Sequence, residues 1–226
     1  MHLNRKKFIF IIILVVVIGL LIGLGFFIKD KQSTVSNQPD ITKVYTLDDF
    51  PQVSKDPESA FGDLVTRLNK DYDYLRQNID FDKYDIWVDI GNTKLGLKDY
   101  AGAVEAWQYA IVLNPKRPLA YSNLGNYYKV FGNDYEKSVY YYDKTIQIDN
   151  IGYFFDYQSY AELYTAGYLP ANPGKVEAIM LEGVAKAGNV EQRQFYQYLY
   201  TFFADSDPEK SAMYKEKLLA IDPSFK

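Results

Sequence analysis

The chain has 226 residues, of which 48% are hydrophobic and 17% aromatic, and its formal net charge is −4 at pH 7. It contains no cysteine and its single histidine is His2, which excludes disulfides, cysteine–zinc sites and histidine-based catalytic or metal sites in a folded domain. The acidic balance, without a Lys/Arg stripe, argues against nucleic acid as a partner. We therefore expect no catalytic residues, no metal and no cofactor, and an enzyme is the least favoured functional class.

Residues 8–28, FIFIIILVVVIGLLIGLGFFI, form an apolar segment without a single charge. A helix of this length, at ~1.5 Å per residue, spans the ~30 Å hydrocarbon core of a membrane. The segment is longer than the core of a signal peptide, and the bulky Phe26-Phe27-Ile28 makes a poor cleavage site. The sequence thus predicts one uncleaved transmembrane helix.

Basic residues flank this segment unequally. Three precede it, namely Arg5, Lys6 and Lys7. Two follow it with an acidic residue between them, namely Lys29, Asp30 and Lys31. By the positive-inside rule, residues 1–7 are predicted to be cytoplasmic and the folded domain to lie outside the cytoplasm.

Gly19 and Gly23 form a G-x-x-x-G motif inside the apolar segment. Such a motif allows two membrane helices to approach closely, so homodimerisation through these glycines is one interpretation. The other is that glycine is simply frequent in membrane helices.

Residues 29–56 are polar and contain Pro39 and Pro51, which predicts a linker between the membrane segment and the folded domain. Two short apolar patches, Val44-Tyr45 and Leu47 to Phe50, interrupt it. The C-terminal half of this linker is therefore either free in solvent or docked on the folded domain through these patches.

Residues 57–83 are predicted to hold an N-terminal capping helix. Asp56-Pro57 has the chemistry of a helix start, and apolar residues then recur on one face: Phe61, Leu64, Val65, Leu68, Tyr72 and Leu75. Asn69 and Asp73 stand where a repeat needs small and aromatic residues, so the helix is either a cap or a decayed repeat.

Two acidic pairs, Asp71/Asp73 and Asp80/Asp82, have the spacing of an acid–base pair or a cation site. They lie near a predicted helix end, beside Lys70 and Lys83. We interpret them as solvated surface carboxylates.

Residues 84–117 and 118–152 share one pattern at a period of 34 to 35 residues. The first copy contains Trp87, Ile90, Gly91, Ala103, Trp107 and Pro115. The second contains Tyr121, Leu124, Gly125, Tyr128, Ser138, Tyr142 and Asn150. Helical spacing places each set on facing sides of two helices, with small residues at the crossing and rings beside it.

Residues 153–188 and 189–226 follow as two more divergent copies. Asn172-Pro173 and Asp207-Pro208 are helix-start signals within them. Ile221-Asp222-Pro223 repeats Leu113-Asn114-Pro115 at the end of the last helix.

The marked positions resemble the tetratricopeptide repeat, W-x2-L-G-x2-Y…A-x3-F…P. The resemblance is specific over residues 84–150 and weak over residues 153–223. It implies an all-α fold, a right-handed superhelix (α-solenoid) of helix pairs behind the single transmembrane helix. In this family the first helices line a concave groove that binds peptides or partner helices.

Carried over by position, the groove would contain Asp85, Val88, Asn92, Leu95, Leu119, Ser122, Asn126 and Lys129. Asn92 and Asn123 match asparagines that some relatives use to clamp a C-terminal carboxylate, but Val88 replaces a required lysine, so no such clamp is expected. The amides of Asn92 and Asn126 either hold the extended backbone of a ligand or are ordinary solvated helix residues. Neither is expected to belong to the core.

These observations predict a membrane-anchored scaffold for protein–protein interaction that binds a protein or peptide ligand, with envelope assembly or secretion as a suitable setting. The alternative is a structural or oligomerising subunit of a membrane complex without a free peptide site. The 22 tyrosines fit two interpretations, core packing and recognition.

Overall fold

The computed structural model describes residues 38–77 and 82–225, and every regular element within these ranges is helical. The chain divides into two compact units, Met1–Gln38 and Pro39–Lys226, and the described helices belong to the second. The predicted membrane segment 8–28, its flanks and the Gly19/Gly23 motif lie outside the described residues. None of the described helices combines the length and apolarity that crossing a bilayer requires.

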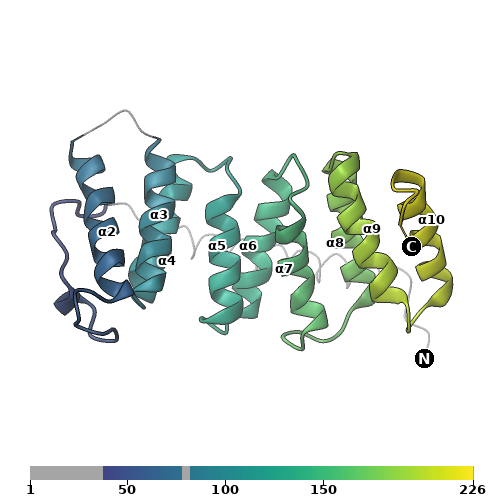
Figure 1. Ribbon diagram of the computed structural model, residues 1–226, viewed down its shortest axis with the longest axis horizontal. Coiled ribbons are helices and arrows are strands. Elements are labelled where there is room, and N and C mark those ends of the chain that lie inside the picture. Colours follow the sequence, from purple (N-terminus) through teal and green to yellow (C-terminus); the bar gives the residue numbers. More distant parts are fainter. Residues whose placement is uncertain (1–37, 78–81, 226) are drawn as a thin grey trace, which may run out of the picture. The chain divides into compact units, whose positions relative to one another are not determined.

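One short 3-10 helix and nine α-helices make up the described part of the chain. They are η1 (Leu47–Asp49), α2 (Ala60–Arg76), α3 (Lys83–Gly96), α4 (Tyr100–Leu113), α5 (Leu119–Val130), α6 (Tyr135–Ile148), α7 (Phe154–Thr165), α8 (Pro173–Lys186), α9 (Asn189–Phe203) and α10 (Pro208–Ile221). Each α-helix packs against the next, in the pairs α3–α4, α5–α6, α7–α8 and α9–α10 (Figure 1). The first helices of successive pairs also touch, α5 with α7 and α7 with α9. This arrangement confirms the predicted all-α, repeat-like architecture.

The helix starts follow the local chemistry of the sequence. Five helices begin with an acidic or amide side chain that accepts a backbone N–H of the first turn: Asp82, Asp99, Asp134, Asn172 and Asp207. Pro173 and Pro208 follow the last two of these caps, where their missing N–H costs nothing. The start of α2 differs from expectation, because the helix begins at Ala60 and Asp56-Pro57 lies in the preceding turn.

Small residues allow the paired helices to cross closely. A Cβ added to Gly91 on α3 would lie 2.4 Å from Nε1 of Trp107, which is a buried side chain on α4. One pair further, a Cβ on Gly125 would lie 3.0 Å from the Tyr142 ring. Both contacts join the residue types that the sequence pattern matched. The crossing therefore depends on glycine, and most strictly in the α3–α4 pair.

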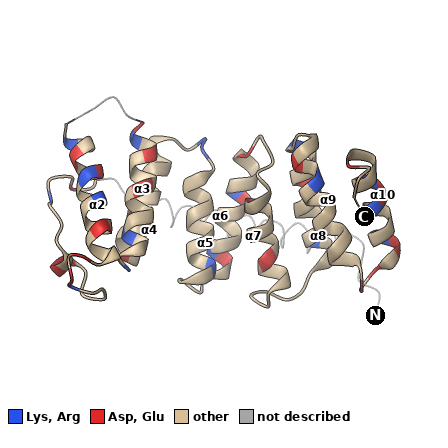
Figure 2. Ribbon diagram, viewed as in Figure 1, with Lys and Arg blue, Asp and Glu red and all other residues tan. Residues whose placement is uncertain are grey.

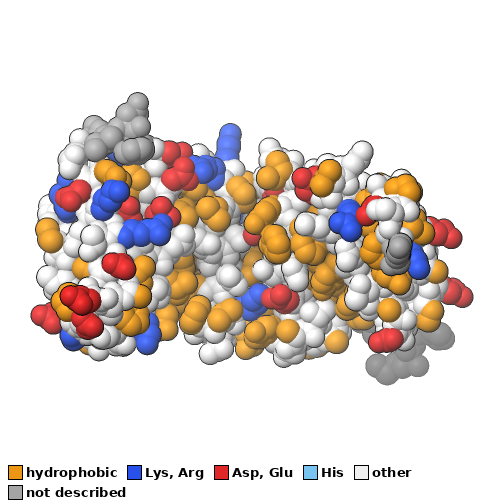
Figure 3. Space-filling model, in the orientation of Figure 1, with side chains coloured by type: hydrophobic (Ala, Val, Ile, Leu, Met, Phe, Trp, Pro, Cys, Tyr) orange, Lys and Arg blue, Asp and Glu red, His pale blue; other side chains and the backbone are white. Residues whose placement is uncertain are grey.

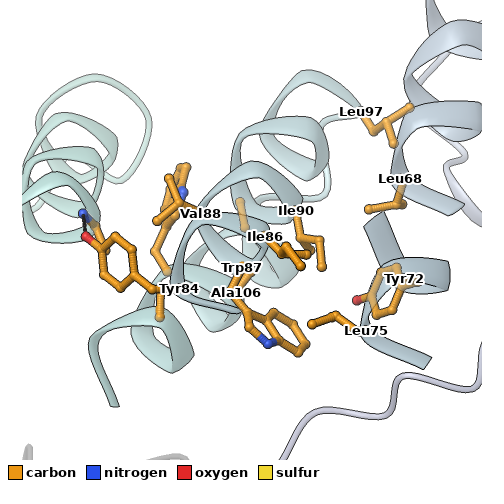
Figure 4. Close-up of a cluster of buried hydrophobic side chains, with 14 of the residues drawn as sticks. Leu68, Tyr72, Leu75, Tyr84, Ile86, Trp87, Val88, Ile90, Leu97 and Ala106 are labelled. Carbon is orange, nitrogen blue, oxygen red and sulfur yellow. Dashed lines mark hydrogen bonds between the residues drawn. The ribbon is translucent and has the colours of Figure 1, made fainter. Parts of the chain in front are cut away.

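The first end of the array is closed by α2. Leu68, Tyr72 and Leu75 of α2 point toward Trp87 and Ile90 of α3 in one buried cluster (Figure 4). The Tyr72 and Trp87 rings meet edge to face, with centroids 6.0 Å apart. This helix therefore covers an apolar face that the α3–α4 pair leaves bare.

Residues 39–53, which we name the N-terminal strap, pack on α2. Phe50 and Val53 are buried, and Tyr45 lies between Phe50 and Tyr72 with ring centroids 5.8 and 5.2 Å away. The distal part of the predicted linker 29–56 thus belongs to the folded unit. The reason is that the apolar patches of this stretch find a hydrophobic partner in α2.

Of the two residues that do not fit a repeat pattern, Asn69 binds the strap directly, and Asp73 pairs with an arginine that binds it. The Asn69 side chain accepts the N–H of Tyr45 and donates to its carbonyl, each over 2.8 Å. Asp73 lies 2.5 Å from Arg76, whose guanidinium donates to the Ile41 carbonyl over 2.7 Å. These residues replace small and aromatic ones because α2 receives an extended chain on this side.

Buried tyrosines account for much of the aromatic excess. Among the described tyrosines, seven are buried: Tyr72, Tyr84, Tyr141, Tyr142, Tyr157, Tyr160 and Tyr214. The hydroxyl groups of Tyr157 and Tyr160 donate to Asp149 over 2.9 Å and to Asp143 over 2.6 Å. Burial and these carboxylates raise the pKa of both phenols, which keeps them protonated donors. Core packing is thus a main use of tyrosine here.

Asp71 is not the solvated carboxylate that the sequence suggested. Its side chain is 8% exposed at the contact between α2 and α3, and its Oδ2 atom has no hydrogen-bond partner among the described residues. Burial, with a smaller contribution from Asp89, raises the Asp71 pKa to about 6, while Arg67 and Lys70 oppose the shift. The other member of the pair, Asp73, is exposed as expected.

The raised pKa predicts how stability depends on pH. The folded state binds this proton more tightly than the unfolded state, so stability falls as pH rises from ~4 to ~7. We expect Asp71→Asn to remove this fall and to stabilise the protein at neutral pH by ~1–2 kcal/mol, a range reduced for solvent screening. Denaturation curves at several pH values measure the effect, with exposed Asp63→Asn as control. Parallel curves for wild type and Asp71→Asn would contradict it.

Candidate functional site

Two of the predicted groove residues are not available to a ligand. Val88 is 2% exposed and belongs to the core. Lys129 is 4% exposed, and its ammonium group lies 2.7 Å from Glu162 and 3.2 Å from the Ser159 carbonyl, both on α7. The prediction is wrong at these positions, because the close packing of α5 against α7 buries Lys129 and the helix-pair core takes Val88.

Two further groove residues are accessible but already paired within the protein. Asp85 lies 2.6 Å from Arg117, which also pairs with Asp82 over 2.7 Å and stacks on the Tyr84 ring. The Ser122 hydroxyl donates to Asp156 on α7 over 2.5 Å. These bonds connect successive helix pairs, so a ligand would have to compete with them.

The amides of Asn92 and Asn126 serve the core, contrary to expectation. Asn92 Oδ1 accepts the indole N–H of Trp107 over 3.3 Å and an N–H of Asn123 over 2.9 Å. One period later, Asn126 Oδ1 accepts the Tyr142 hydroxyl over 3.4 Å. Both asparagines are exposed, yet each satisfies the polar atom of a ring that fills a helix crossing.

We expect Asn92→Ala to destabilise the protein by ~1–2 kcal/mol, because the Trp107 N–H loses its acceptor inside the helix pair. Asn126→Ala is the matched variant one period on, and it should cost less. The Tyr142 hydroxyl also bonds Ser159 and keeps that contact. Urea denaturation of both variants measures the difference. Variants as stable as wild type would contradict a structural role for these amides.

The remaining predicted groove residues are Leu95, which is half-buried, and Leu119, which is 47% exposed. Of the eight, Leu119 is therefore the accessible apolar residue. It lies at the start of α5, one 34-residue period before Tyr153. The position equivalent to Leu119 therefore lies at the N-terminal end of α7.

A pocket of about 440 Å³ lies between α7 and α9, the first helices of the third and fourth pairs. Its lining consists of Phe154, Gln194, Gln197, Tyr198, Thr201 and Phe202. The sequence pattern did not mark it, because these helices belong to the divergent copies. The available signal was the run of uncharged residues 194–203, QFYQYLYTFF, which exceeds what one buried helix face needs.

Five rings form a continuous series that leads from the surface into this pocket; we name it the aromatic row. The centroids of Tyr153 and Phe155 are 5.6 Å apart, and those of Phe155 and Phe154 are 5.7 Å apart. Tyr198 follows at 6.2 Å from Phe154, and Phe202 at 6.1 Å from Tyr198. Tyr153 and Phe155 are each 54% exposed. Figure 3 shows that hydrophobic side chains are exposed over much of the face that it displays.

The site is electrically neutral. No residue of the lining is charged, and α9 carries no charge after Arg193 (Figure 2). Arg193 itself pairs with Asp222 over 2.7 Å, and Glu162 pairs with Lys129 over 2.7 Å. Burial raises the pKa of the Tyr198 phenol, which therefore stays neutral as well. Such a surface favours an uncharged ligand, because burying a charge here would leave it unpaired.

Within the described residues no group of three or more acidic or histidine side chains is arranged to hold a metal ion. Comparison with protein-family models and with curated proteins yields no match. The geometry of the pocket and of the aromatic row is therefore the basis for proposing a function.

Proposed function

We propose that this protein is a membrane-anchored scaffold of the tetratricopeptide-repeat type that binds a partner protein on the face formed by α7 and α9. The observation that carries the proposal is the neutral 440 Å³ pocket reached through the aromatic row. Pockets of this size, lined by rings with a few polar groups, are typical of ligand sites. The face is built by first helices of successive pairs, as the resemblance to the repeat family implies.

Surface exposure of the rings favours binding over a purely structural role. Tyr153 and Phe155 leave more than half of their surface in water, at a cost that a partner would relieve. Aromatic residues are also enriched at the cores of protein interfaces. The alternative is a structural or oligomerising subunit of a membrane complex, in which this face would be covered by another subunit or by a second copy of the chain.

The repeat-family assignment is supported by the α3–α4 and α5–α6 pairs. Gly91 under Trp107 and Gly125 under Tyr142 occupy corresponding helix crossings one period apart. The membrane anchor is supported by the sequence of residues 8–28 and by the basic residues before it. We place the folded domain outside the cytoplasm on the same basis.

Photo-crosslinking in native membranes tests the binding face. A photoreactive aromatic amino acid is placed at Phe155, and in a matched strain at Val112, a 55% exposed residue of α4. We expect a distinct crosslinked protein from position 155 that is missing from position 112. A product whose mass is twice that of the chain identifies the oligomerising alternative. Equal crosslinking from both positions would move the binding site elsewhere.

The membrane orientation gives a separate prediction. Protease added outside intact cells or spheroplasts is expected to digest the helical domain, because the more basic flank of residues 8–28 stays in the cytoplasm. Immunoblotting of the domain measures the digestion. Protection until the cells are lysed would reverse the proposed topology.

A further inference from the structure

The turns that join one helix pair to the next lie along one edge of the described domain, the upper edge in Figure 1. We name it the pair-linking edge, and its turns are residues 114–118, 149–153 and 187–188. The Ser122 hydroxyl of α5 donates to Asp156 of α7 near the starts of both helices. A Cβ added to Gly152 would lie 2.8 Å from the Cβ atom of Ala187. Side-chain and backbone contacts therefore connect successive parts of this edge.

Aliphatic side chains are exposed along the pair-linking edge. Five of them lie in one of its turns or within two positions of one: Val112, Leu113, Leu119, Ile151 and Val190. Val190 is 80% exposed and Ile151 is 64% exposed. None of the five lines the pocket between α7 and α9 or belongs to the aromatic row. They form a second apolar surface, and it is separate from the candidate site.

The charges at this edge have no net sign. Arg117 is paired with two carboxylates at the start of α3, and Asp149 is buried with its carboxylate hydrogen-bonded. Lys116 and Glu191 are exposed, and they have opposite signs. A strongly charged partner would gain little here, whereas zwitterionic lipid headgroups match an edge without net charge.

The chain from the proposed anchor enters the domain at this same edge. The Ile41 carbonyl accepts a hydrogen bond from Arg76, which is the last residue of α2, and α2 ends at the upper edge in Figure 1. Only residues 29–40 separate Ile41 from the apolar segment, and they reach ~43 Å at most. A short tether gives the tethered surface an effective concentration on the order of mM, so that weak insertion of a few side chains is sufficient.

The arrangement of the five side chains favours a flat lipid surface over a protein ligand. Protein interfaces concentrate their affinity in a few central side chains that are fully enclosed. The five side chains are instead distributed along the edge, from the end of α4 to the start of α9. Shallow insertion into a bilayer needs no enclosure, because the apolar groups enter only ~5–10 Å into the headgroup boundary.

We infer that the pair-linking edge docks on the lipid bilayer and inserts its aliphatic side chains into the headgroup region. This inference rests on the membrane anchor of the proposed function, which keeps the bilayer within reach. It adds a second contact with the membrane, made by the folded domain itself. The lipid contact and the proposed partner site use different residues.

The test uses the full chain in phosphatidylcholine vesicles, with one chain per vesicle so that no second copy is present. The chain has no cysteine, so Ile151→Cys accepts a single fluorophore at the edge. Phe131→Cys is the matched control: it is an exposed position at the far end of the 12-residue α5, ~18 Å from the edge. Nitroxide-labelled lipid quenches a fluorophore that lies among the headgroups. Val190→Asp is added to Ile151→Cys as the disrupting variant, because an acidic residue is compatible with the first turn of α9.

We expect quenching at position 151 to be at least about twofold stronger than at position 131, and to weaken by a similar factor when Val190→Asp is added. Equal quenching at the two positions, or unchanged quenching with Val190→Asp, would overturn the inference. Quenching that requires several chains per vesicle would assign the edge to a second copy and overturn it as well. Vesicle flotation tests the anchor separately. Chains that float without quenching refute the lipid contact alone, whereas chains that fail to float refute the proposed anchor too.

Discussion

Trp107→Ala is expected to lower the free energy of unfolding by ~3–5 kcal/mol, the range for truncating a large buried side chain. Trp107 is 1% exposed and fills the crossing of α3 and α4. Its loss leaves a cavity, and Asn92 loses the indole N–H that it accepts. Urea denaturation followed by circular dichroism measures the change. A shift below about 1 kcal/mol would contradict the packing described for this pair.

A double variant isolates the contact itself. Gly91→Ala in the wild-type background should destabilise by ~1–3 kcal/mol, because the new methyl group meets the indole ring. In the Trp107→Ala background the same change should cost little, since the ring is gone. Gly125→Ala, with 3.0 Å to the Tyr142 ring, is the matched control and should cost less than Gly91→Ala. Additive effects of the two substitutions would show that they do not interact.

Asp149→Ala is the second substitution with a large expected effect, ~2–4 kcal/mol of lost stability. Asp149 is 4% exposed, and its carboxylate accepts the N–H groups of Ile151, Gly152 and Tyr153 and the hydroxyl of Tyr157. Removing it leaves these donors unpaired at the turn between α6 and α7. The same turn sets the position of Tyr153, the first ring of the aromatic row.

Asn114 provides the control for this prediction, because it occupies the same place after α4 as Asp149 does after α6. Among the described residues, its side-chain oxygen accepts the N–H of Lys116 alone, over 3.2 Å. We expect Asn114→Ala to cost less than about 1 kcal/mol. Thermal melting of both variants compares the two turns. Equal losses of stability in the two variants would mean that the buried hydrogen bonds of Asp149 do not stabilise the protein.

Much of the fold was predictable because its signals are local. Glycine and a large ring at fixed spacing identified the crossing of Gly91 with Trp107, and Asn172-Pro173 and Asp207-Pro208 marked the starts of α8 and α10. The strap was less predictable, since its apolar patches pack on α2 and it also bonds Asn69 and Arg76, all of them distant in the sequence. The burial of Asp71 likewise depends on how α2 meets α3.

The candidate site was the least predictable feature. Position in the repeat placed Lys129 and Asn92 on the first helices correctly but did not reveal that they bond Glu162 and Trp107. Such bonds depend on side-chain geometry between helices rather than on spacing within one helix. The pocket combines Phe154 of α7 with residues of α9, a pairing that only the packed structure brings together.

The strap would also shorten the tether between the proposed membrane anchor and the folded domain. Because Ile41 and Tyr45 are bound to α2, only residues 29–40 separate the proposed membrane anchor from folded structure. Fully extended, that stretch reaches ~43 Å, whereas all of residues 29–56 would reach ~100 Å. With the proposed anchor, the strap end of the domain would therefore stay within ~43 Å of the bilayer.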